Sequence, residues 1–578
     1  MNDLRRTVLW SVFGFSLLML WDGYLRHTGQ PSMFSPGPSA SAVAADAASA
    51  ASAALAASQG VPAATGAATA PGAVAAAASG ATAEVPAKPR EMVVISTDTV
   101  RATVDTLGGN IVKLELLKHT DQDDHTKLIA ILDQAGVHTE VAQTGLVSGT
   151  GALPDHTTPM TVLTAQRKLE IGEDALSLKL ESAAVNGVKR VITYTFSRGS
   201  YVVGVKQDVV NGSNAAVNPQ WYVQLQRDGV VPAMSGFFGA PTSYTGSAFY
   251  TEAAKFQKVD YAHIEEGKAE FAKSADNGWV AVVQHYFAAA WLNTAKAPRE
   301  FFARKVGPNL YTVGMMFPVG EVAPGQTKST QSQLFVGPQE EKKLEAIAPG
   351  LELVKDYGWV TILAKPLFWL LHIIHSVLQN WGWSIVALVV LLKAAFYGLN
   401  ASAYRSMAKM KAINPRIQEM RERLKDKPQE MQQEMLRMYR EEKVNPIGGC
   451  LPIVVQIPVF IALYTVLLAS VEIRQAPWTY IADLAKPDAL FGVIPGIHLP
   501  IGPLPILMTL SSVLQTWLNP TPPDPVQAKM MWIMPLVFSV MFFFFPAGLV
   551  LYWLTNNILS IAQQWMINRS IEGASSKA

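Results

Sequence analysis

The sequence predicts an α+β membrane protein in which a large β domain and a bundle of membrane helices occupy separate stretches of the chain. Two observations lead to this prediction. Residues up to about 350 read as soluble, with short β-branched runs and apolar–polar alternation typical of half-buried strands. The remainder alternates long apolar runs with polar connectors, which is typical of membrane spans. With 578 residues, the chain is long enough for several domains.

The first segment, residues 1–28, is predicted to be a membrane anchor. Arg5 and Arg6 precede an apolar run from Val8 to Trp21, which fits either a cleaved signal peptide or a retained span. The residues directly after the run suit cleavage poorly, because small-residue patterns appear only near Ser39–Ala45. We therefore favour a retained and rather short span.

Residues 29–90 are predicted to be a disordered tether. They consist almost entirely of Ala, Ser, Gly, Pro and Thr, and such a stretch lacks the bulky apolar side chains that offset the entropy of ordering. As a flexible coil, about 60 residues have a root-mean-square span of roughly 40 Å. We expect this tether to connect two domains and to carry no site of its own.

Residues 91–350 are predicted to form one large β-sandwich. The stretches Met92–Thr97, Thr99–Val104 and Tyr201–Val209 show period-two alternation or short β-branched runs, and turn signals such as Gly108–Asn110 separate them. Many strands with few helical stretches over about 250 residues are typical of a sandwich.

A helical membrane core is predicted over residues 376–568, after an amphipathic, aromatic helix over 351–375 that we expect on the outer membrane surface. We expect five spans in this core, near Ser376–Asn400, Leu451–Val471, Pro500–Leu518, Met530–Phe545 and Leu549–Ile567. Several are shorter than the ~20 apolar residues that a standard bilayer needs, so we expect local thinning of the bilayer. With the anchor, the prediction is six transmembrane helices in total.

Basic residues give the predicted orientation. Arg5 and Arg6 precede the anchor, and the connector 401–445 is rich in Lys and Arg. The positive-inside rule puts both in the cytoplasm. The β domain then lies outside, and the tail, residues 569–578, returns to the cytoplasm.

The composition argues against several function classes. A net charge of +2 over the whole chain is too small to indicate a protein that binds nucleic acid over much of its surface. The single cysteine, Cys450, excludes an intramolecular disulfide and any multi-cysteine metal site. Nucleotide-binding, dinucleotide-binding, zinc-protease and nucleophile-elbow motifs do not occur in the sequence. We therefore expect neither an enzyme nor a cofactor.

Lys393 is the leading candidate for a functional residue, because it interrupts the apolar run from Trp383 to Tyr397. A charge at the centre of a span costs about 2.5–3.5 kcal/mol on insertion scales, and such residues usually face a partner, a watery cavity or a substrate path. The core of the predicted spans contains no acidic residue, so a structural ion pair or a proton relay is not expected. Polar span residues are individually more often interhelical glue, but together with Lys393 they favour a hydrated interior. We predict that its polar positions include Gln456, Gln515 and Asn557.

The connector 401–445 is predicted to be a helical hairpin, since Pro415 and Pro428 suit first helical positions. Its apolar residues fall at helical spacing and are rich in methionine. They are Met410, Ile413, Ile417, Met420 and Leu424 in the first arm, and Met431, Met435 and Met438 in the second. Two interpretations remain open: an antiparallel seam that packs on itself, or an adaptable Met-lined surface for varied hydrophobic clients.

Four stretches of the helical part resemble the YidC family of membrane protein insertases, in the long form of Gram-negative bacteria. They are Tyr404–Met410, Glu442–Pro452, Val471–Pro477 and Phe545–Trp553. Gly278–Phe287 and Leu334–Pro338 of the outer domain are similar to that family too. The resemblance covers nearly everything except the tether.

The resemblance implies a periplasmic β-supersandwich followed by a five-helix insertase core with a hydrophilic groove. The positive groove position falls on Lys393, where many relatives have arginine, and it would attract the polar, often acidic tail of a client. Gln456 matches a polar groove position, and Tyr552 and Trp553 match an aromatic pair that contacts clients.

The same resemblance implies the location and the partners. They are the bacterial inner membrane, nascent integral membrane proteins, the Sec translocon (SecYEG and SecDF), membrane lipids and, for the hairpin, the ribosome or the signal recognition particle receptor. Two alternatives compete with this interpretation. A small-solute transporter would often show an internal repeat, which the sequence lacks. Sugar chemistry in the β domain would need a catalytic His and Glu pair, which the sequence does not reveal.

Overall fold

The computed structural model describes residues 61–62, 90–230 without 123, 136 and 137, 244–424, 427–441, 451–495, 499–519 and 525–575. The predicted anchor, residues 1–28, lies outside the described residues, as does most of the predicted tether. The described chain forms two compact units, which we call the β unit (up to Lys355) and the helical unit (from Asp356).

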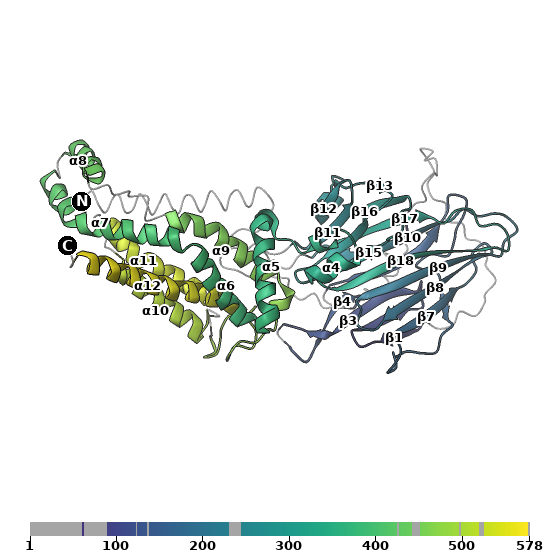
Figure 1. Ribbon diagram of the computed structural model, residues 1–578. Helices are drawn as coiled ribbons and strands as arrows, with labels where there is room; N and C mark the ends of the chain where they lie inside the picture. The colour runs from purple at the N-terminus through teal and green to yellow at the C-terminus, as the bar shows by residue number, and fades with distance from the viewer. Residues whose placement is uncertain are drawn as a thin grey trace. The chain divides into compact units, whose positions relative to one another are not determined.

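The β unit consists of two nine-stranded sheets, and every pairing between neighbouring strands in these two sheets is antiparallel (Figure 1). The first sheet has the order β1 (Met92–Ser96), β2 (Val100–Asp105), β3 (Asn110–Thr120), β4 (Leu128–Asp133), β5 (Glu140–Val147), β10 (Gln220–Asp228), β17 (Leu310–Pro318), β16 (Arg299–Gly307) and β13 (Ser274–Ala275). The second has the order β12 (Lys255–Val259), β11 (Gly246–Thr251), β14 (Trp279–Val283), β15 (Phe287–Leu292), β18 (Thr327–Pro338), β9 (Val202–Asn211), β8 (Val188–Ser197), β7 (Ala175–Ser182) and β6 (Met160–Val162).

Alternation in the sequence explains how the sheets pack. In β7, Leu176, Leu178 and Leu180 are buried while the residues between them are exposed, as the period of two in a strand requires. Large aromatic side chains fill the space between the sheets, and Trp291 of the second sheet donates its Nε1–H to the backbone oxygen of Gln224 in the first, at 3.0 Å. The two-sheet sandwich predicted from the sequence is therefore confirmed.

Short helices complete the β unit. They are α3 (Tyr261–Glu265) and α4 (Glu341–Ile347). Leu344 of α4 and the following Leu351 and Val354 are buried against an apolar cluster that includes Trp279. Residues 351–354 therefore pack on the β unit and do not begin the interfacial helix that we predicted over 351–375.

The helical unit contains eight helices among its described residues. They are α5 (Thr361–Leu378), α6 (Trp381–Ala395), α7 (Tyr397–Arg423), α8 (Pro428–Glu441), α9 (Leu451–Ala469), α10 (Pro503–Leu518), α11 (Pro525–Phe542) and α12 (Ala547–Ser575). A two-stranded hairpin, β19 (Val493–Ile494) and β20 (Leu499–Pro500), precedes α10. Helix α12 packs against α6, α7, α9 and α10.

The predicted span Ser376–Asn400 is divided in the structure. Helix α5 continues to Leu378, and Asn380 caps the next helix by accepting the backbone N–H of Trp383 at 3.1 Å. A 64° bend then separates Trp381–Ala395 from the start of α7. Figure 1 shows α5 lying across the direction of α7, α9 and α12.

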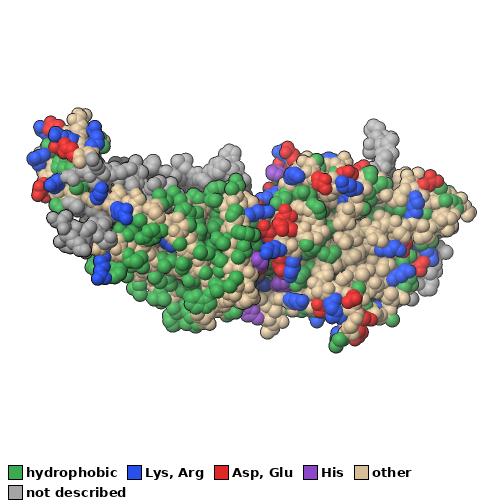
Figure 2. Space-filling view, in the orientation of Figure 1, with side chains coloured by type: hydrophobic (Ala, Val, Ile, Leu, Met, Phe, Trp, Pro, Cys, Tyr) green, Lys and Arg blue, Asp and Glu red, His purple; other side chains and the backbone are tan. Residues whose placement is uncertain are grey.

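Among the described residues, one straight helix, Gly358–Leu378, is long and apolar enough to span a membrane, and the bent pair at Phe396 is a second candidate. Val455–Ala469 and Ala528–Phe542 are apolar but shorter. Side chains such as Trp359, Ile362 and Val377 of the first candidate are exposed. The surface of the helical unit in Figure 2 is broadly hydrophobic, and charged side chains gather at the α7–α8 end.

Candidate functional site

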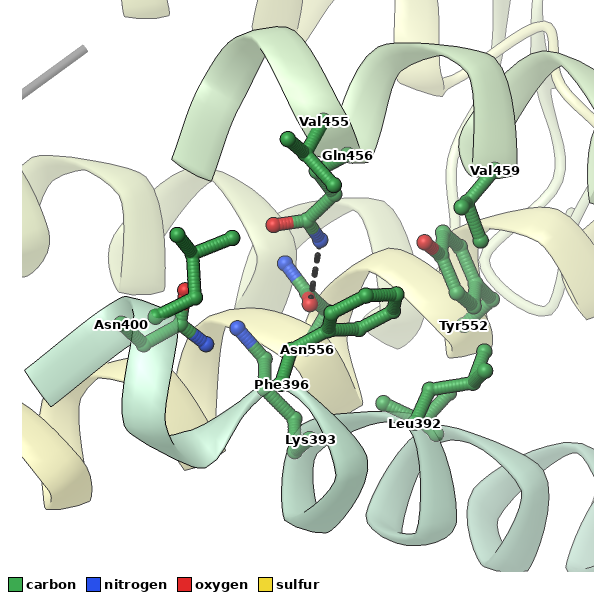
Figure 3. A pocket seen from close by; sticks show the side chains of 11 residues that line it. Leu392, Lys393, Phe396, Asn400, Val455, Gln456, Val459, Tyr552 and Asn556 are labelled. Atoms are coloured by element: carbon green, nitrogen blue, oxygen red, sulfur yellow. Dashed lines mark hydrogen bonds between the residues drawn. The ribbon is translucent and has the colours of Figure 1, made fainter. Parts of the chain in front are cut away.

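A pocket with polar groups lies among four helices of the helical unit (Figure 3). Its cavity volume is about 30 Å³, room for about two water molecules, within about 410 Å³ of space that is partly open solvent. Each helix contributes one polar or charged side chain: Lys393 from α6, Asn400 from α7, Gln456 from α9 and Asn556 from α12. The rest of the lining is the ring of Tyr552 and the apolar side chains Val389, Leu392, Phe396, Leu399, Val455 and Val459.

A hydroxyl group holds the ammonium of Lys393. Its Nζ donates to Oγ of Ser560 on α12 at 2.7 Å. The same Oγ donates to the backbone oxygen of Asn556 at 2.7 Å, so two successive hydrogen bonds link the lysine to the backbone of α12. Helices α6, α9, α10 and α11 contain no Asp or Glu. The positive charge is therefore held by a neutral partner and is not cancelled by a carboxylate from these helices.

The second polar contact joins the helices on either side of the pocket. Gln456 Nε2 donates to Oδ1 of Asn556 at 2.6 Å, as the dashed line in Figure 3 shows. Both side chains are partly exposed, so neither amide is sealed in an apolar core. Amide groups that remain accessible next to a cation can hold water or a polar guest, which is what a hydrated groove requires.

The aromatic pair of α12 is divided between two environments. Tyr552 lines the pocket and is 3% exposed. Trp553 packs instead against two phenylalanines, with ring centroids 4.3 Å from Phe460 and 5.1 Å from Phe542. Phe460 lies 6.2 Å from Tyr552 as well. The pair therefore connects the pocket to an aromatic cluster made by α9, α11 and α12.

The interior of the helical unit changes character along its length. Toward the ends of α6 and α9 that meet α5, and at the start of α12, the interior is an apolar cluster that includes Ile385, Leu388, Leu463, Val466 and Leu549. Farther along the same helices, Lys393, Gln456 and Asn556 face the pocket. The unit is thus tightly packed on its α5 side and polar on the other.

Two of the predicted groove residues do not line this pocket. Asn557 is 4% exposed and donates from Nδ2 to Oγ of Ser511 and of Ser512 on α10, at 3.2 Å each. It therefore acts as interhelical glue between α10 and α12. Gln515 is half-buried on α10 and is not among the residues that line the pocket.

Sequence reasoning missed Ser560 and chose Asn557 where the structure has Asn556. Helical spacing contained the signal, because residues four apart lie on one face. Tyr552, Asn556 and Ser560 follow one another at this spacing, whereas Asn557 is rotated by about 100° from Asn556.

The arms of the hairpin pack on each other where both are described. Ile413, Ile417 and Met420 of α7 are buried, and Met431, Met435 and Met438 of α8 pack against them. The side chain of Met410 lies outside the described residues. A self-packed seam is therefore present, and the exposed Leu436 adds an apolar side chain on α8 beyond it.

A two-sheet β-sandwich followed by an apolar helical unit with a charged pocket defines an integral membrane protein with a large extramembrane domain. The chain matches the YidC periplasmic domain over residues 92–370 and the 60Kd inner membrane protein family over residues 373–574. It belongs to the YidC family of membrane protein insertases. The family expected from the sequence motifs is thus confirmed.

Relatives match the chain over its full length. A membrane protein insertase YidC from Janthinobacterium sp. (strain Marseille) is 52% identical over 571 residues, which cover 98% of this chain and 99% of the relative. Another from Herminiimonas arsenicoxydans is 51% identical over 583 residues, with 100% of both chains covered.

Solved structures give weaker likenesses. An active YidC insertase crystal structure with the first transmembrane domain resolved is 17% identical, covers 82% of this chain and 94% of that one, and has a TM-score of 0.37. A putative aldose 1-epimerase from Escherichia coli K12 is 14% identical, covers 43% of this chain and 99% of that one, and has a TM-score of 0.27. At these scores neither likeness bears on the function of this chain.

Proposed function

We propose that the protein inserts integral membrane proteins into the bacterial inner membrane, and that the polar part of a client first enters the pocket around Lys393. One observation supports this above the others. The Lys393 ammonium sits in an apolar helical unit and has the Ser560 hydroxyl as its partner. An acidic client tail supplies a countercharge when it arrives and removes it when it leaves, so the site is reset without covalent chemistry.

The uneven interior supports entry from one side. Among the described residues, the α5 end of the interior holds the apolar cluster, whereas Lys393, Asn400, Gln456 and Asn556 offer polar contacts on the other side. Under the positive-inside rule the basic connector lies in the cytoplasm. The pocket then opens toward the cytoplasm, α5 lies at the periplasmic surface, and the β unit is periplasmic.

The remaining candidate residues fit later steps of the same pathway. Tyr552 and Trp553 form an aromatic wall that contacts the apolar segment of the client as it leaves the pocket for lipid. The parts of Met431, Met435 and Met438 that the seam leaves exposed provide, with Leu436, an adaptable apolar surface at the cytoplasmic entrance. Partners in this proposal are nascent membrane proteins, lipids and the Sec translocon, with the ribosome or the signal recognition particle receptor at the hairpin.

Site-specific photocrosslinking to a stalled nascent membrane protein tests the proposal. We expect crosslinks from probes at Gln456 and Tyr552, which line the pocket. A probe at Leu510, which is 60% exposed on α10 and lies outside the pocket, serves as the matched control. Equal crosslinking from all three positions would show that clients do not use the pocket.

A further inference from the structure

Two residues of the predicted tether contact the β unit. Val61 packs against a small apolar cluster formed by Val147, Tyr222 and Met316, together with Phe302. The next residue, Pro62, is buried. Neither contact belongs to the helical unit or to its pocket. A stretch that we expected to carry no site therefore includes a dipeptide with a defined place on the first sheet.

The floor of this place is built by aromatic rings lying on glycines. A Cβ added to Gly145 would come within 2.3 Å of the Tyr222 hydroxyl, and one added to Gly314 would come within 2.4 Å of the Phe302 ring. Both glycines lie directly across the ladder from the aromatic residue concerned, Gly145 from Tyr222 and Gly314 from Phe302. Only glycine leaves the rings room to lie flat, so the sheet has a smooth apolar surface here.

A cation next to this floor recognises the backbone of the tether. Arg304, two residues after Phe302 on β16, donates from Nη1 to the backbone oxygen of Val61 at 2.9 Å. Its guanidinium lies 5.3 Å from the centroid of the Phe302 ring, a cation–π distance that holds the group in place. The site thus combines an apolar seat for valine, a buried proline and a charge-assisted hydrogen bond to the carbonyl between them.

We propose that Val61-Pro62 is a docking motif that fastens the tether to the first sheet of the β unit, at the seat made by Val147, Tyr222, Phe302, Arg304 and Met316. Proline suits this role because its fixed φ reduces the entropy lost on docking. Residues 63–89 then connect the motif to β1 of the same unit, and residues 29–60 connect it to the predicted anchor. As a general measure, a flexible coil of about 30 residues has a root-mean-square span of roughly 30 Å, and one of about 60 residues roughly 40 Å.

Covalent connection makes such a small contact sufficient. A flexible linker of this length holds its motif near the seat at an effective concentration in the millimolar range. A dipeptide with a millimolar affinity would therefore be docked for much of the time, and would still release when the anchor and the β unit move apart. Docking therefore shortens the stretch of predicted tether between the anchor and the β unit by about half, and with it the reach of the β unit.

Thiol labelling of the full-length protein in nanodiscs tests the proposal. Val61→Cys in a Cys450→Ser background places a thiol of similar size in the seat. The chain supplies a matched control, because Val85-Pro86 repeats the same dipeptide in the same predicted tether, and Val85→Cys places a thiol in this second copy of the dipeptide. We expect the thiol at position 61 to react with a maleimide about fivefold more slowly than the thiol at position 85.

Second-site substitutions identify the seat. Phe302→Ala or Arg304→Met should bring the labelling rate at position 61 up to that at position 85. Lys305→Ala is the control, because Lys305 is adjacent on β16 but pairs with Glu265. Equal rates at the two thiols in the otherwise unchanged protein would overturn the proposal. So would slow labelling at position 61 that neither seat variant relieves, or that depends on protein concentration, since the motif would then dock elsewhere or on a second copy.

Discussion

Lys393 on α6 donates a hydrogen bond to Oγ of Ser560 on α12, at 2.7 Å, and Ser560 in turn donates to the backbone oxygen of Asn556 one turn earlier. The lysine is therefore oriented by a helix that also lines the pocket with Asn556 and Tyr552. A hydroxyl orients the ammonium without neutralising it. This arrangement separates two properties that mutation can test individually, namely the sign of the charge and its position.

The first prediction concerns the charge at position 393. Lys393→Arg should retain insertion, because a positive field persists even though the geometry of the head group changes. Lys393→Glu should impair clients with acidic tails. A unit charge pair about 8 Å apart is worth about 2 kcal/mol at an effective dielectric constant of about 20, so reversing the sign changes the interaction by about 4 kcal/mol, or roughly 1,000-fold in capture. Insertion yield of clients with acidic and neutral tails measures this effect.

A control separates the pocket from the overall charge. Lys529→Glu on α11 makes the same change of charge at an exposed residue outside the pocket, and should leave insertion unaltered. Loss of insertion in both Glu variants, or in neither, would contradict the role of Lys393.

The second prediction concerns the Gln456–Asn556 hydrogen bond. Gln456→Leu and Asn556→Leu should each lower the insertion yield and the free energy of unfolding. The double variant should lose less stability than the two single variants together, with a coupling energy of about 0.5–1.5 kcal/mol. Asn557→Ala removes contacts to Ser511 and Ser512 instead, so it should lower stability while leaving pocket crosslinks in place. Additive losses at 456 and 556 would show that the bond does not join the two helices functionally.

These contrasts indicate what sequence could and could not predict. Lys393 was predictable because a charge inside an apolar run violates the hydropathy pattern. For Ser560, helical spacing places the hydroxyl on the same face as Tyr552 and Asn556, but only the crossing of α6 and α12 makes it the partner of the lysine. The alternation in the β unit predicted a sandwich, but the order of nine strands in each sheet depends on long-range pairing that local patterns do not encode.

The sequence also did not predict the bend at Phe396 or the short motif Val61-Pro62. The bend at Phe396 involves neither proline nor glycine at that position, so the apolar run from Trp383 to Tyr397 gave no sign of it. Val61-Pro62 was overlooked because its surroundings are low in complexity, and a dipeptide is too short for any periodicity. Its seat exists only after β5, β10, β16 and β17 have paired.

The third prediction concerns the hairpin seam. Met420 is 3% exposed and lies against the methionines of α8. Met420→Asp buries a charge without a partner and should separate the two arms, whereas Leu436→Asp changes a half-exposed side chain and should leave the seam intact. Protease sensitivity of the connector measures the state of the seam in the two Asp variants.

Removing residues 415–440 should abolish complementation of an insertase-depleted strain. Growth of the depleted strain measures the effect of the deletion, and normal growth would show that the hairpin is dispensable.

The fourth prediction concerns the pH dependence of the β unit. Burial raises the pKa of Glu140 to about 7, although Arg227 and Gln284 act in the opposite direction. Arg227 Nη1 lies 3.5 Å from the Glu140 carboxylate, a distance at which the ion pair compensates only in part for desolvation. A folded-state pKa above the unfolded value means that the contribution of Glu140 to stability is fully present below about pH 4.5 and is lost as the pH rises through 7.

The loss amounts to something on the order of 3 kcal/mol, which corresponds to a fall of about 5–10 °C in the unfolding temperature of a domain of this size. Glu140→Gln keeps an acceptor for Gln284 but cannot ionise, so its unfolding temperature should match that of the unchanged protein near pH 5 and exceed it near pH 8. Glu265→Gln is the control, because hydrogen bonds from Lys305 and Tyr311 lower the pKa of that exposed carboxyl, so its effect on stability should be the same at pH 5 and at pH 8. Thermal unfolding of the full-length protein between pH 5 and 8, followed by tryptophan fluorescence, measures the difference. If Glu140→Gln lowers stability equally at both ends of this range, Glu140 is ionised throughout, and the Arg227 pair outweighs the cost of burial.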